Sequence, residues 1–97
     1  MSIDERDAVR YRASENVAAS IMGDELAILD FGSDTYFTLN STGAFLWHQL
    51  ATPKSMSDLA DSVALDFGVE ASVARADVVE LLADLLRLGL VTPDESA

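Results

Sequence analysis

Residues 34–47 read DTYFTLNSTGAFLW, and within them the spacing of apolar side chains changes from the period of a strand to that of a helix. In the TYFTL segment, Phe37 and Leu39 fall on one face of an extended chain. Asn40 follows as the expected N-cap of a helix over residues 41–51. The stretch therefore predicts a strand that leads directly into a helix.

Two more strands are predicted upstream. The apolar runs at 17–22 and 25–31 are separated by Gly23 and Asp24, a pair that suits a two-residue hairpin loop. Together with residues 35–39 they predict a three-stranded antiparallel meander. Such a small sheet is not stable alone, so it must pack on another element.

Two further helices are predicted downstream. The first begins at Ser55, which forms a capping-box pattern with Asp58, and ends at Gly68. The second covers residues 70–88, with Gly89 as its C-terminal cap. The predicted fold class is therefore α+β, with three strands followed by three helices (βββααα).

The last helix has more apolar surface than a core-facing stripe needs. Its polar arc consists of Asp77, Glu80, Asp84 and Arg87. One apolar flank consists of Val78, Leu81, Leu82 and Leu85, and the second of Val79, Ala83 and Leu86. One flank should pack in the core, and the sequence leaves open which one. The surplus flank indicates a groove or a subunit contact, unless the helix is central and covered on both sides.

The chain is acidic, with 17 Asp and Glu against 6 Lys and Arg among 97 residues, and its net charge is −11. Residues 55–97 carry most of this excess, which disfavours binding to nucleic acid. No apolar run is long enough to span a membrane, and we expect a single cytoplasmic domain.

The sequence contains no familiar catalytic or metal-binding motif. His48 is the only histidine and there is no cysteine, so the usual zinc sets are excluded. Nucleophile-elbow and phosphate-loop motifs are also absent. We therefore expect neither enzymatic activity nor a metal or cofactor, and we expect Trp47, Phe45 and Phe67 to pack in the core.

Two parts of the sequence resemble a known family. Residues 34–47 are similar to the x-Y-F-x-L-N-x-x-G-x-x-[IL]-W segment of the PqqD-like family, and residues 81–91 resemble its terminal [FL]-L-x-x-L-x-x-x-G-L-[ILV]. The similarity covers residues 15–92, which we take as the recognition domain. It would lie between a flexible segment, 1–14, and a frayed acidic tail, 93–97.

The resemblance implies a small winged-helix-like domain that is a recognition element (RiPP recognition element) for ribosomally made, post-translationally modified peptides. Such a domain binds the leader segment of a precursor peptide as an added strand, between its third strand and third helix. It then delivers the precursor to modifying enzymes such as a leader peptidase and a cyclase. Among family types, the stand-alone subunits of lasso-peptide pathways are favoured over the PqqD peptide chaperone.

The resemblance and the amphipathic pattern together predict a peptide-binding site on strand 35–39 and the last helix. The expected residues are Asp34, Thr35, Tyr36, Phe37, Thr38, Val78, Val79, Leu82, Ala83 and Leu86. Asp77, Glu80 and Asp84 would lie along one edge of the cleft. Two other functions stay open: a winged-helix transcription regulator, which the acidic last helix disfavours, and a homodimeric structural module.

Overall fold

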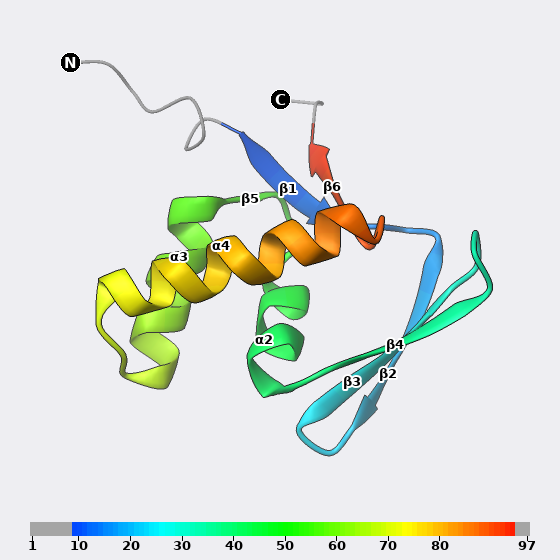
Figure 1. Cartoon of the computed structure of the whole chain (residues 1–97), viewed down its shortest axis with the longest axis horizontal. Helices are drawn as coiled ribbons and strands as arrows, with labels where there is room; N and C mark the ends of the chain where they lie inside the picture. Colours follow the sequence, from blue (N-terminus) through cyan, green and yellow to red (C-terminus); the bar gives the residue numbers. More distant parts are fainter. Residues whose placement is uncertain (1–8, 95–97) are drawn as a thin grey trace.

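The computed structural model describes residues 9–94, which form two small sheets and three helices (Figure 1). The elements in chain order are β1 (Arg10–Ala13), β2 (Val17–Met22), β3 (Glu25–Asp30), β4 (Thr35–Leu39), α2 (Ser41–Gln49), β5 (Lys54–Ser55), α3 (Met56–Phe67), α4 (Ala71–Arg87) and β6 (Val91–Asp94). The predicted α+β class is confirmed.

The predicted meander is present as an antiparallel sheet in the order β2-β3-β4. Gly23 has a φ of 67° in the two-residue turn, and Met22 lies opposite Glu25. A positive φ at the first turn residue is characteristic of a type II′ hairpin, and glycine adopts it without strain. In Figure 1 this sheet extends to one side of the helices, with β2 and β4 as its two edges.

A second sheet, in the order β5-β1-β6, was not predicted. It pairs Arg10 with Asp94 and Ala13 with Val91, so residues that we expected to be a flexible segment and a frayed tail are partly in strands. The element order is therefore not βββααα. This sheet was not predicted because it pairs opposite ends of the chain, and such a pairing produces no hydrophobic pattern within either segment. Pro93 also lowers the strand propensity of β6. Residues 1–8 and 95–97 lie outside the described part.

The helix ends follow the predicted capping residues. Asn40 accepts a hydrogen bond from the Gly43 N–H over 3.0 Å, which caps α2. The Ser55 hydroxyl accepts from the Asp58 N–H over 3.1 Å, and the Asp58 carboxylate accepts in return from the Ser55 N–H over 3.3 Å. Gly68 ends α3 with a φ of 66°. α2 ends two residues earlier than the sequence predicted.

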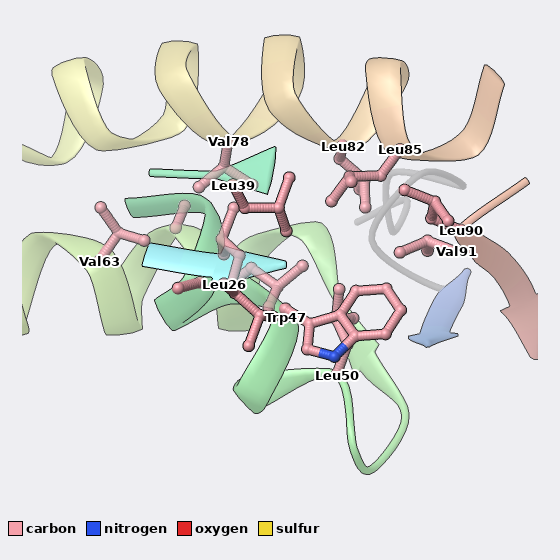
Figure 2. Packing of buried hydrophobic residues seen from close by; sticks show 14 of the residues in the cluster. Leu26, Leu39, Trp47, Leu50, Val63, Val78, Leu82, Leu85, Leu90 and Val91 are labelled. Atoms are coloured by element: carbon pink, nitrogen blue, oxygen red, sulfur yellow. The ribbon is translucent and has the colours of Figure 1, made fainter. Parts of the chain in front are cut away.

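One core holds the sheet β2-β3-β4 and the three helices together (Figure 2). Its largest fully buried side chains are Leu26, Ile28, Leu46, Leu50, Leu59, Val78, Leu82, Leu85, Leu90 and Val91. Trp47 is buried as predicted, but Phe67 is 40% exposed and packs edge-to-face on Phe45 with ring centroids 5.4 Å apart. The prediction that Phe67 is a core residue was therefore wrong, because it lies at the exposed end of α3.

Candidate functional site

The open edge of β4 carries a defined set of main-chain groups. The Phe31 N–H donates to the Asn16 carbonyl over 3.1 Å, which extends the β2–β3 ladder beyond the pair Val17 and Asp30. In an antiparallel ladder, pairs that exchange hydrogen bonds alternate with pairs that do not. Counting from this bond, the main-chain N–H and C=O of Ile28 point away from β2 and toward β4.

The same alternation continues across β4. Ile28 lies opposite Phe37, so the main-chain groups of Phe37 pair with β3. The N–H and C=O of Tyr36 and Thr38 consequently face the open edge, where an added strand could bond them. The Tyr36 side chain is 72% exposed, whereas Phe37 is half-buried against the core and Leu39 is buried. The predicted assignment of faces in this strand is confirmed.

The loop between β3 and β4 is held by hydrogen bonds to Asp30, and it positions the N-terminal end of β4. Asp30 accepts hydrogen bonds from the Gly32 N–H over 3.1 Å and from the Ser33 hydroxyl over 2.9 Å. Asp34 has a φ of 55°, a conformation that Asp adopts more readily than most residues. Asp34 and Thr35 are exposed, as are Tyr36 and Thr38, so Phe37 is the one predicted residue on the β4 side that is half-buried.

A depression of about 310 Å³ lies between α4 and the junction of β4 with α2. Its lining residues are Asn40, Thr42, Asp77, Glu80, Leu81 and Asp84. Leu81 is a half-buried apolar residue among three carboxylates. The Asp84 carboxylate accepts a hydrogen bond from Arg87 over 3.0 Å at an exposed position. The side of α4 that faces this junction therefore combines one leucine with the carboxylates of Asp77, Glu80 and Asp84, which we call the acidic arc.

Two predicted peptide-binding residues are core residues instead. Val78 and Leu82 have a relative exposure of 0%, and Figure 2 shows both pointing with Leu85 from α4 into the core. A peptide cannot contact them while the core stays packed. The prediction was wrong at these two positions because the flank that faces the core includes them both.

The other three predicted α4 residues do not line the depression. Val79 and Ala83 are exposed and Leu86 is half-buried, so this flank is the surplus one. The buried residues of α4, namely Ala74, Val78, Leu82 and Leu85, form a stripe along the helix. At 100° per residue, the surplus flank lies on one side of this stripe and Leu81 lies on the other. Leu81 lines the depression but was not among the predicted site residues. Its position next to the acidic arc on the helix was the sequence signal that could have identified it.

The remaining candidates for chemistry are not brought together. His48 is exposed, and among residues 9–94 no three His, Cys, Asp or Glu side chains are grouped so that they could hold a metal ion. No helix in the described part is long and apolar enough to cross a membrane. The geometry that stands out is an accessible strand edge that ends at an acidic depression.

Comparison with known families decides the relationship. The model of the family described as coenzyme PQQ synthesis protein D (PqqD) matches residues 25–91, which is more than half of the chain. The chain belongs to the PqqD family. The match begins at β3 and ends at the first residue of β6, so it includes β4, the three helices and every residue that lines the depression. No curated protein matches this PqqD-family chain.

Two solved structures share the fold of this PqqD-family chain. TbiB1, in complex with the TbiA(beta) leader peptide, has a TM-score of 0.75 and 23% sequence identity over 89% of this chain and 96% of that chain. Lasso peptide synthetase B1, complexed with the leader peptide, has a TM-score of 0.73 and 25% sequence identity over 86% of this chain and 98% of that chain. Nearly the whole of each of these chains is matched, so the likeness covers the entire domain.

Proposed function

We propose that this PqqD-family chain binds the leader segment of a ribosomally made precursor peptide as an added strand on β4. The observation that carries the proposal is the open β4 edge beside a depression on α4. Its support is a fold shared with two proteins whose structures are complexes with leader peptides. Because one of these proteins is named lasso peptide synthetase B1, we propose that the chain acts in a lasso-peptide pathway.

The physical basis is strand addition, in which main-chain hydrogen bonds give affinity and side-chain pockets give specificity. The outward N–H and C=O groups of Tyr36 and Thr38 would form the main-chain hydrogen bonds. The half-buried Phe37 and the depression around Leu81 would contact the side chains of the peptide. A leader that runs along β4 toward Asn40 would place one of its apolar side chains over Leu81.

The chain would take no chemical step itself. It would hold the leader while separate enzymes, such as a leader peptidase and a cyclase, act on the precursor. The sheet β2-β3-β4, extending beside α2, α3 and α4, also supports the winged-helix-like arrangement that the family resemblance implied.

The test is a titration of fluorescein-labelled leader peptide, from the precursor encoded beside this gene, followed by fluorescence anisotropy. A series of leaders, each N-methylated at one amide, would then be compared. Loss of a main-chain hydrogen bond should weaken binding about tenfold at every second position, and the positions between should tolerate the methyl group. A scrambled leader is the control.

Two outcomes would contradict the proposal. Sensitivity at a spacing of three to four residues would indicate a helical peptide in a groove instead of an added strand. Equal binding of the leader and its scrambled control would show that the β4 edge does not recognise a leader.

A further inference from the structure

The edge of the sheet opposite β4 is formed by β2, and within the described residues its outer side has no strand partner. The sequence of β2, VAASIM, contains no charged residue and no proline. Charges and prolines are the usual devices that prevent edge strands from pairing. Ile21 and Met22 are 70% and 62% exposed, so the edge also presents apolar side chains to solvent.

The outward main-chain groups of β2 follow from the hydrogen bond between Phe31 and Asn16. Because that pair exchanges a hydrogen bond, the alternation directs the N–H and C=O of Val17, Ala19 and Ile21 away from β3. The side chains of these three residues share the core-facing side of the sheet, since Ile21 lies opposite the buried Leu26.

This edge is complementary to itself. A second copy related by a twofold axis at Ala19 would run antiparallel and bring Val17 of each chain opposite Ile21 of the other. Every residue in this register presents outward N–H and C=O groups, so the two strands can exchange hydrogen bonds. Each exposed Ile21 side chain would then contact a valine across the strands, a favourable pair of apolar β-branched residues.

We propose that β2 is a homodimerisation edge, through which two copies join their sheets in the order β4-β3-β2-β2-β3-β4. We infer that a second copy of the chain binds this edge, because a twofold-symmetric interface requires that the same two residues contact each other in both directions. Val17 and Ile21 meet this requirement. The edge is also an uncharged segment of a chain whose net charge of −11 repels another copy elsewhere. Both β4 edges stay open in this dimer, so the inference goes beyond leader binding and does not depend on it.

The experiment is sedimentation velocity of the whole chain over about two decades of concentration, because mass action favours the dimer at high concentration. We expect a reversible monomer–dimer equilibrium that shifts toward dimer as salt screens the repulsion between the two acidic chains. Ala19→Lys places two lysines directly opposite at the twofold axis and should raise the dimer dissociation constant at least tenfold. Ala18→Lys is the matched control, because it adds the same charge opposite Ser20 of the other copy.

Several results would overturn the inference. A monomer at every concentration would exclude the dimer, and equal effects of the Ala18 and Ala19 variants would exclude this register. Dimer dissociation by saturating leader peptide would show that the peptide and the second copy compete for β2. Leader binding by a monomeric chain would leave the proposed function intact while it refutes the dimer, so the two proposals fail separately.

Discussion

Val78 and Val79 are consecutive residues of α4 with opposite environments: Val78 is 0% exposed and Val79 is 43% exposed. The 100° turn between neighbouring helical residues moves the side chain from the core stripe to the solvent-facing flank. The pair therefore identifies which apolar flank of the helix is structural. It also shows that the surplus flank lies on the other side of the stripe from Leu81 and the depression.

Replacing each valine with alanine should separate their contributions to stability. Val78→Ala removes methyl groups from a fully packed site and should lower the free energy of unfolding by about 2 kcal/mol. Val79→Ala should change it by less than about 0.5 kcal/mol, as is usual for surface positions. Urea unfolding followed by circular dichroism measures both. Equal losses would mean that the two flanks are packed alike.

Leader binding should depend on Leu81, beside the depression, and not on Val79, on the surplus flank. Leu81→Ala enlarges the depression beside Asn40 and should weaken binding of a labelled leader about five- to tenfold, because it removes apolar contact area. Val79→Asp is the matched variant on the surplus flank, and it should leave both the fold and the affinity unchanged. If Val79→Asp weakens binding and Leu81→Ala does not, the peptide lies along the flank that the sequence alone had suggested.

The cap at the junction of β4 and α2 should matter for stability and for the site. Asn40 accepts a hydrogen bond from the Gly43 N–H and also lines the depression. Asn40→Ala leaves that N–H without its partner and should cost about 1 kcal/mol of stability. Asn40→Asp keeps the acceptor and should retain stability in thermal unfolding. An alanine variant as stable as the native chain would show that the cap does not hold this junction.

Local patterns predicted the parts of the site whose signals lie within a few residues. The alternation of Phe37 and Leu39 with polar neighbours fixed the faces of β4, and Asn40 fixed the start of α2. The rotation of α4 relative to β4 was not predictable in this way. It depends on how Val78 and Leu82 pack against other elements, and a helical wheel shows only that two apolar flanks exist.

The second sheet shows the same limit. Arg10 pairs with Asp94 across almost the whole sequence, and each of these strands has only four residues. Only the closure of the helices on the core brings the two ends of the chain together. Hydrophobic periodicity along the chain does not reveal such a pairing, so the sequence did not predict β1, which precedes residue 15.

The acidic arc on α4 should accelerate association with basic leaders. Asp77, Glu80 and Asp84 line the depression that lies at the end of the β4 edge. Carboxylates on the approach path raise the association rate of a cationic peptide at low salt. We expect the stopped-flow association rate of a leader with Lys or Arg to fall several-fold between low and physiological ionic strength. The dissociation rate should change little.

The contribution of the arc itself can be separated from that of overall charge. Glu80→Gln with Asp84→Asn should reduce the salt dependence of the association rate. Asp61→Asn with Asp66→Asn changes the net charge equally on exposed positions of α3 and is the matched control. Because exposed charge pairs contribute only about 0–1 kcal/mol, the effect should appear in the rate more than in the affinity. If the two double variants respond identically to salt, steering comes from the net charge of −11 and not from the arc. A rate that is indifferent to salt would leave the acids as solubilising residues, with recognition carried by strand pairing and the contact at Leu81.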